Sequence, residues 1–328
     1  MKQAEKKWRD PDFGPLSDKQ GGAFSIYYDG QDQDHLPSKL EDIQWLRPEQ
    51  YLADVEDATE PVFIKAGSSS NEVKQGNIGN CWFISALSIL ATHDELIVGS
   101  TGIVDKDSLE MLDSTSVAEC SKGLLPAIFH RFTKIGVYCF RFFKNYSWRY
   151  VIIDTELPYD KNFQTLVFAK CLDPSELWVP LIEKAYAKLA GCYQALTSGN
   201  IDDGLVDMTG YACEKLKYSE DDYYKNKEAI WEQLMDAVAN NSLMGCSRSP
   251  DGAGVETDLE IESIGPTGLV CGHAYSIMSL FELHDSKMQN PRKTHRLFHI
   301  RNPWGEKEWI GPWSGGESDD KEKLETHR

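Results

Sequence analysis

The chain has 328 residues, of which 41% are hydrophobic and 11% aromatic, enough for about two domains with substantial cores. Its 34 basic and 52 acidic side chains give a formal net charge of −18, and no local basic patch interrupts the acidic surface. Such a field repels phosphates, so nucleic acids and anionic membrane surfaces are excluded as expected partners.

The N-terminal sequence and the cysteines indicate the compartment. The charged start MKQAEKKWRDPDFG lacks the apolar core of a secretory signal, and no stretch reaches the ~18–20 apolar residues that span a bilayer. The eight cysteines are scattered and include no CxxC pair, unlike a disulfide framework or a zinc site. We therefore expect an intracellular, cytoplasmic protein without a transmembrane segment.

Hydrophobic spacing divides the chain into three parts. Residues 1–40 are polar with little periodicity, and we expect a flexible N-terminal lead-in there. Residues 41–212 read as a helix-rich first lobe, and residues 213–328 as a strand-rich second lobe. The predicted elements in chain order are a helix beginning at Cys81, a hairpin of 137–142 and 147–153, helices over 174–190 and 228–239, and strands over 269–281 and 297–301. This order predicts an α+β protein with two lobes, and a cleft between lobes is a common place for an active site.

The first candidate catalytic residue is Cys81. A Ser-, Asn- and Gly-rich loop at 68–80 ends at this cysteine, and Asn80 is a plausible N-cap for the helix that follows. A thiol attacks as thiolate, and the positive end of a helix dipole favours that form. Gly76 and Gly79 would let the backbone approach a substrate closely. The alternative, an inert buried cysteine, fits the other seven cysteines better than this one.

Gln75 lies six positions before Cys81, on the same loop. Its side-chain amide could point an N–H at the oxygen of a tetrahedral intermediate, beside the backbone N–H of Cys81. Donors of this kind contribute about 10²–10³-fold in rate. Taken alone, Gln75 is as well explained as a surface loop residue.

His273 and Asn302 form the second candidate group. His273 is predicted on a strand, where an isolated histidine is commonly a satisfied core residue. Asn302 ends the next strand, and the connection between them allows the two strands to pair. An amide oxygen there can accept from one ring nitrogen and leave the other for Cys81. Trp304 could shield that hydrogen bond from water, or serve only in packing.

The motifs around these residues resemble the three catalytic blocks of the calpain family, which has a papain-like fold. They are QGNIGNCWFISAL at 75–87, GHAYS at 272–276 and RNPWG at 301–305, with further similarity at 43–48, 176–188 and 207–210. The similarity spans about residues 40 to 314. It implies an intracellular cysteine endopeptidase that acts on protein substrates through an acyl-enzyme. It also implies that Gln75 is the oxyanion donor, Cys81 the nucleophile, His273 the base and Asn302 the residue that orients it.

The resemblance also implies regulation by calcium, with a site in each lobe. In the first lobe, Gly67, Glu72 and Glu176 fall on the matching positions, and the carbonyl of Lys65 can join them. These are the oxygen ligands that calcium takes. In the second lobe Glu308 matches, but Gly315 stands at the next carboxylate position, and the remaining ligand loop would lie past Arg328. We therefore expect a second lobe that is incomplete at its C-terminal end, and accessory domains or subunits outside this chain.

Two other functions compete with proteolysis. A transglutaminase would use Cys and His but usually an Asp as third member, which Asn302 does not match. A catalytically latent pseudoprotease or interaction module would fit an incomplete second lobe, although all the catalytic positions are filled.

Overall fold

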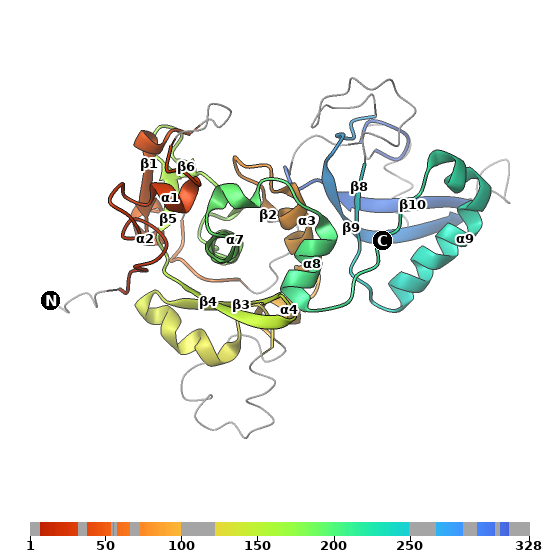
Figure 1. The fold of residues 1–328 in the computed structure, drawn as a ribbon. Helices are drawn as coiled ribbons and strands as arrows, with labels where there is room; N and C mark the ends of the chain where they lie inside the picture. The colour runs from red at the N-terminus through yellow and green to blue at the C-terminus, as the bar shows by residue number, and fades with distance from the viewer. Residues whose placement is uncertain are drawn as a thin grey trace. The chain divides into compact units, whose positions relative to one another are not determined.

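The computed structural model describes residues 7–31, 38–53, 55, 58–65, 73–99, 122–248, 267–284, 294–305 and 309–314 (Figure 1). The chain separates into two compact units, residues 1–214 and 215–328. Each unit is described by itself. The candidate metal ligands Gly67, Glu72 and Glu308 lie outside the described residues.

The first unit contains six α-helices, three short 3-10 helices and seven strands among its described residues. The α-helices are α1 (Ala23–Ile26), α2 (Pro48–Tyr51), α3 (Cys81–Leu90), α4 (Asp94–Val98), α7 (Trp178–Ala190) and α8 (Ile201–Thr209). The 3-10 helices are η1 (Leu40–Asp42), η3 (Ala127–Ile135) and η4 (Tyr193–Leu196). The strands are β1 (Ile43–Leu46), β2 (Val73–Lys74), β3 (Tyr138–Lys144), β4 (Ser147–Ile153), β5 (Leu157–Asp160), β6 (Thr165–Leu166) and β7 (Lys170–Cys171).

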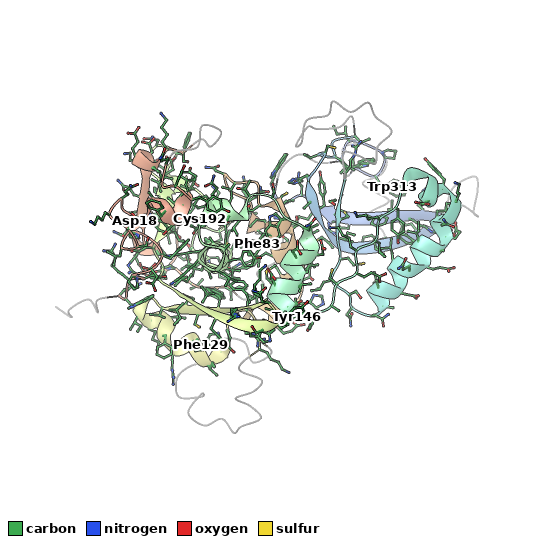
Figure 2. All side chains as sticks on the ribbon, viewed as in Figure 1. Asp18, Phe83, Phe129, Tyr146, Cys192 and Trp313 are labelled. Atoms are coloured by element: carbon green, nitrogen blue, oxygen red, sulfur yellow. The ribbon has the colours of Figure 1, made fainter. Side chains whose placement is uncertain are left out.

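The core of this unit is built around α3 and α7. All ten residues of α3 are buried, so this helix is covered on every side rather than along one stripe. Phe83 of α3 stacks on Tyr186 of α7 with ring centroids 4.5 Å apart, and Figure 2 shows Phe83 among the side chains that fill the unit. Helix α8 packs against α3 through Gly204, where a Cβ would come within 3.0 Å of Ala86. The helix that begins at Cys81 is therefore held rigidly by its surroundings.

The predicted hairpin is confirmed. Strands β3 and β4 pair antiparallel from Tyr138 opposite Ile153 to Lys144 opposite Ser147. The two residues between them, Asn145 and Tyr146, have φ angles of 52° and 59°, as a two-residue type I′ turn requires.

Two predicted helices are confirmed with different starting points. Helix α7 begins at Trp178 rather than near residue 174, because the preceding residues form a turn in which the Asp173 carboxylate accepts from the Ser175 N–H at 2.9 Å. Helix α9 (Glu220–Ala239) begins eight residues before the predicted start at 228. Ser219 caps it, since the hydroxyl of Ser219 accepts from the Asp222 N–H and the Asp222 carboxylate accepts from the Ser219 N–H.

The N-terminal segment, for which composition predicts a loosely ordered lead-in, is packed against the first unit between residues 8 and 31. Phe13 and Tyr27 are 2% and 1% exposed. The Asp10 carboxylate accepts from Lys188 of α7 at 2.7 Å. On the same helix, Lys184 is fully buried and pairs with Asp154 at 2.5 Å. The ion pair of Asp10 and the ring contacts of Phe13 with Trp45 and Tyr193 therefore tie this segment into the core.

The described part of the second unit is a three-stranded sheet with one helix against it. Its strands are β8 (Gly245–Ser247), β9 (Ala274–His284) and β10 (Thr294–Arg301), in the order β10-β9-β8. Trp231 of α9 packs with Ile277 and Leu280 of β9. Strands β9 and β10 are antiparallel, and Arg301 lies opposite Ser276. The start of β9 and the end of β10 therefore meet at one end of the sheet.

Candidate active site

The loop that leads into Cys81 runs from Gln75 to Asn80, and its path is fixed by backbone contacts. Before the loop, β2 pairs with β7. Within it, the Asn77 N–H donates to the Val167 carbonyl at 3.0 Å, and the Gly79 carbonyl accepts from the Ser198 N–H at 3.0 Å. Both neighbouring segments belong to the first unit, so the loop has little freedom apart from that unit.

Gly76 is required by close contact with the protein's own backbone. A Cβ on Gly76 would lie 2.2 Å from the carbonyl carbon of Phe168, whereas a Cβ on Gly79 would come no closer than 3.6 Å to Thr197. Contact with the protein's own backbone is therefore enough to require glycine at position 76, and the approach of a substrate to Gly76 and Gly79 stays a prediction. Its hydrogen atom lets the loop lie directly on the 167–169 backbone.

Gln75 is buried, with 9% of its surface exposed, rather than a solvated loop residue. Its Nε2 donates to the Ile78 carbonyl at 2.7 Å, and the same carbonyl accepts from the Asn80 N–H at 2.8 Å. One of the two amide hydrogens of Gln75 is thereby used to orient the side chain. The second remains available as a donor.

Cys81 is the first residue of α3, as predicted, and is 9% exposed. Asn80 stands at the N-cap position, but its side chain does not cap the helix. Its Nδ2 donates instead to the carboxylate of Glu183 at 2.7 Å. The first intrahelical bonds run to the Asn80 carbonyl from the N–H groups of Phe83 and Ile84, at 2.9 and 3.1 Å. The Cys81 thiol therefore lies at the positive end of a ten-residue buried helix.

His273 and Asn302 lie together in the second unit. His273 precedes β9 by one residue, and Asn302 follows β10 by one. The structure thus places both just outside the strands on which they were predicted, at the end of the sheet where the strands meet. The two side chains share a hydrogen bond of 2.9 Å between His273 Nε2 and Asn302 Oδ1. His273 is fully buried.

The arrangement leaves the other ring nitrogen of His273 for a further partner. Nδ1 is buried and has no hydrogen-bond partner among the described residues. Because an amide oxygen only accepts, Nε2 carries the hydrogen in the neutral ring, and Nδ1 presents a lone pair. A base needs a lone pair of this kind.

Aromatic side chains enclose the imidazole. The ring of Trp304 lies 4.4 Å from that of His273, between centroids, and the ring of Tyr275 meets it edge-on at 5.0 Å. The backbone N–H of Trp304 donates to Asn302 Oδ1 at 3.0 Å, which fixes the orientation of the amide. Burial lowers the pKa of His273, and the bond to Asn302 partly offsets that effect.

The described members of the predicted calcium site are Lys65 and Glu176. Glu176 is 2% exposed, and its Oε1 accepts from the backbone N–H of Lys65 at 2.5 Å. The side chain of Lys65 pairs with Asp173. The backbone N–H of Lys65 therefore donates to the carboxylate of Glu176, and the binding of calcium by these two residues stays a prediction. Among the residues that the structure describes, no cluster of three or more Asp, Glu, His or Cys side chains could hold a metal ion.

Sequence reasoning assigned no role to Glu183, which lies within the region of similarity at 176–188. This glutamate is 0% exposed and is bonded to the residue before Cys81. Apolar Val179 and Ala187 lie one turn before and after Glu183 in α7, and this is the signal that could have revealed it, because a buried carboxylate needs partners.

The first unit has a thiol at the start of a buried helix and an amide on the preceding loop, and the second unit has a histidine bonded to an asparagine, which are features of a papain-like cysteine protease core. The family model described as calpain family cysteine protease matches residues 8–327. The chain belongs to this family. Its α+β composition agrees with the papain-like core that the family shares.

Individual relatives give the same result. The chain is 33% identical to calpain-5 of Caenorhabditis elegans over 285 residues, which are 83% of this chain and 39% of the relative. It is 31% identical to the calpain-type cysteine protease DEK1 of Arabidopsis thaliana over 314 residues, 94% of this chain and 12% of that protein. It is 31% identical to the calpain-2 catalytic subunit of Macaca fascicularis over 280 residues, 84% and 33% of the two chains. The chain thus spans well under half the length of these relatives.

Proposed function

We propose that this protein is a calcium-regulated intracellular cysteine endopeptidase that carries out limited proteolysis. Cys81 is the nucleophile, His273 its base, Asn302 the residue that orients the base, and Gln75 a donor to the oxyanion. The substrates are proteins, and regulatory domains or subunits outside these 328 residues are further partners. Family membership and the geometry of the two half-sites support this proposal.

The bond between His273 and Asn302 is the observation that carries the proposal. It fixes the tautomer in which Nδ1 can take a proton from a thiol. The thiolate of Cys81 then attacks the carbonyl carbon of the scissile peptide, and the negative charge that develops on the oxygen is met by the second amide hydrogen of Gln75. The proton held by His273 passes to the leaving amine, and water, deprotonated by the same nitrogen, hydrolyses the thioester.

Calcium regulation rests on the first-lobe residues. Glu176 fits a hard-oxygen site, since its carboxylate is buried and lies beside the segment that leads through Lys65 to Gly67 and Glu72. Together with the Lys65 carbonyl these residues would hold an ion that links the loop before Gln75 to the start of α7. Glu308 is the one matching ligand proposed for the second unit. Among the described residues no helix is long and apolar enough to cross a membrane.

Cleavage of casein by the purified protein, with millimolar calcium or with a chelator, tests the proposal. The wild type should cleave casein when calcium is present, and Cys81→Ser should cleave none while it keeps its circular dichroism spectrum. Cleavage that persists in Cys81→Ser would refute the assignment of the nucleophile. Equal cleavage with and without calcium would refute the proposed regulation, and no cleavage by the wild type would favour a catalytically latent module.

A further inference from the structure

Glu183 of α7 is a buried carboxylate that joins Asn80, the residue before Cys81, to Ala169 of the neighbouring segment. Its Oε1 accepts from the side-chain amide of Asn80 at 2.7 Å, and its Oε2 accepts from the backbone N–H of Ala169 at 2.8 Å. Both oxygens are therefore used, and both donors are neutral N–H groups. The side chain is 0% exposed.

The contact with Asn80 acts on the nucleophile. Asn80 immediately precedes Cys81, and its carbonyl accepts the first two backbone bonds of α3. With its side chain held by Glu183, the peptide that joins residues 80 and 81 has a fixed orientation. The direction of the Cys81 side chain and of its backbone N–H follows from that orientation.

The contact with Ala169 acts on the oxyanion donor. Ala169 precedes Lys170, which pairs with Lys74 directly before Gln75. One residue earlier, the backbone of Phe168 forms the surface on which Gly76 lies. The bond from Ala169 to Glu183 therefore fixes residues 168–170, and these residues contact Lys74 and Gly76 on either side of Gln75.

A buried carboxylate without a cation lowers stability relative to an apolar side chain, so packing alone does not explain a glutamate at this position. Burial without a cation disfavours the charged form and raises the pKa of Glu183 to about 7, against the opposite effect of its two hydrogen bonds. Burial raises the pKa of Tyr193, and the charge of Glu183 raises it further. Ionisable groups retained in such surroundings are more common at functional sites than elsewhere.

We infer that Glu183 is a positioning residue for catalysis, which holds Cys81 and Gln75 at a fixed separation by bonding to Asn80 at the end of the loop between them and to Ala169 in the segment beside the start of that loop. This inference rests on the proposed roles of Cys81 and Gln75. Glu183 touches neither residue, and it acts through Asn80 and Ala169.

The donors and acceptors suggest a swap that separates this role from general stability. In Glu183→Gln, the new amide can accept from Ala169 only if its NH₂ faces the NH₂ of Asn80. A 180° rotation of the Asn80 amide would relieve that conflict. It would, however, move the NH₂ group to the buried position that Oδ1 now occupies, where Oδ1 has no hydrogen-bond partner among the described residues. In the double variant Asn80→Asp/Glu183→Gln, the glutamine accepts from Ala169 and donates to the aspartate, so every contact is restored.

The experiment compares Asn80→Ala, Glu183→Gln and the double swap with the wild type. The control is Asp207→Asn, which changes a buried carboxylate of the same unit that is bonded to Tyr186 and Lys144 and not to the loop. The readouts are the rate of Cys81 alkylation by iodoacetamide between pH 5 and 9, kcat and KM for a peptide substrate, and hydrogen exchange of residues 76–84.

Asn80→Ala and Glu183→Gln should each lower the alkylation rate and kcat about tenfold, because a displaced Cys81 thiolate attacks the bound substrate more slowly. KM should change less than about twofold, because neither substitution removes a contact with the substrate. The swap should recover most of that loss, and Asp207→Asn should leave the alkylation rate unchanged even if it unfolds at a lower temperature.

Wild-type rates in Asn80→Ala would overturn the inference, as would a swap no better than Glu183→Gln or a control with an equal loss. Should Glu183→Gln fail to fold, Asn80→Ala decides alone. Alkylation and hydrogen exchange do not require turnover, so they test the role of Glu183 even if the wild type cleaves no substrate.

Discussion

Removal of the Asn302 side chain should slow catalysis without abolishing it. In Asn302→Ala, Nε2 of the fully buried His273 loses an acceptor at 2.9 Å, and the alanine offers no replacement. Leaving a buried polar group without its partner costs about 1–3 kcal/mol, which corresponds to roughly 5- to 150-fold in rate if the reactive orientation of the ring bears the whole cost. His273→Ala removes the base itself and should cost about 10²–10⁴-fold.

The assay is kcat/KM for a fluorogenic peptide, with the pKa of His273 followed by NMR. Because the bond to Asn302 raises a pKa that burial lowers, Asn302→Ala should lower it further. The stability of the second unit should also fall as the pH drops from about 6.5 towards the folded-state pKa, since only the unfolded histidine then takes up a proton. Ser279→Ala is the matched control, because it removes a 3.3 Å contact to His299 on the exposed part of the same strand pair. Equal losses in Asn302→Ala and His273→Ala, or a rise in the histidine pKa, would refute this reasoning.

Three further predictions concern the first unit. Gly76→Ala should destabilise this unit by about 1–3 kcal/mol and slow alkylation of Cys81, because the new Cβ would overlap backbone atoms of Phe168. Gly79→Ala should be nearly neutral in thermal unfolding, and equal effects of the two variants would contradict the close contact at Gly76. Lys184→Met should lower the free energy of unfolding in urea by about 3–5 kcal/mol, because it leaves the buried carboxylate of Asp154 without its cation. Lys161→Met breaks an exposed pair with Asp42 worth about 0–1 kcal/mol, and similar urea midpoints for the two variants would disprove the difference. Iodoacetamide should label Cys81 before any other cysteine in peptide mapping, and uniform labelling would count against an activated thiol.

Much of the fold, and the pairing of His273 with Asn302, follows from local sequence. The apolar run after Cys81 predicted α3, and the position of Asn302 after a predicted strand indicated its pairing with His273. These predictions succeeded because helical spacing and antiparallel pairing are local or depend on a single connection.

The parts that sequence did not predict depend on contacts between distant segments. Asn80 was predicted to cap α3, but its side chain turns to Glu183, 103 positions away along the chain. Gly76 was assigned to substrate approach because nothing near it in sequence reveals that the 167–169 backbone lies against it. The N-terminal segment is polar in composition, yet Phe13 packs against Trp45 and Tyr193, and Asp10 pairs with Lys188, all of which belong to later elements.

Covalent labelling by a peptidyl fluoromethyl ketone tests most directly whether Cys81 and His273 act together. Such a reagent binds as a substrate does and needs both an attacking thiolate and a functioning base. Intact-mass and peptide analysis should show one adduct, on Cys81, in the wild type, and slowing of about 10²-fold or more in His273→Ala. An adduct on another cysteine, or equal labelling in His273→Ala, would contradict the proposed catalytic pair.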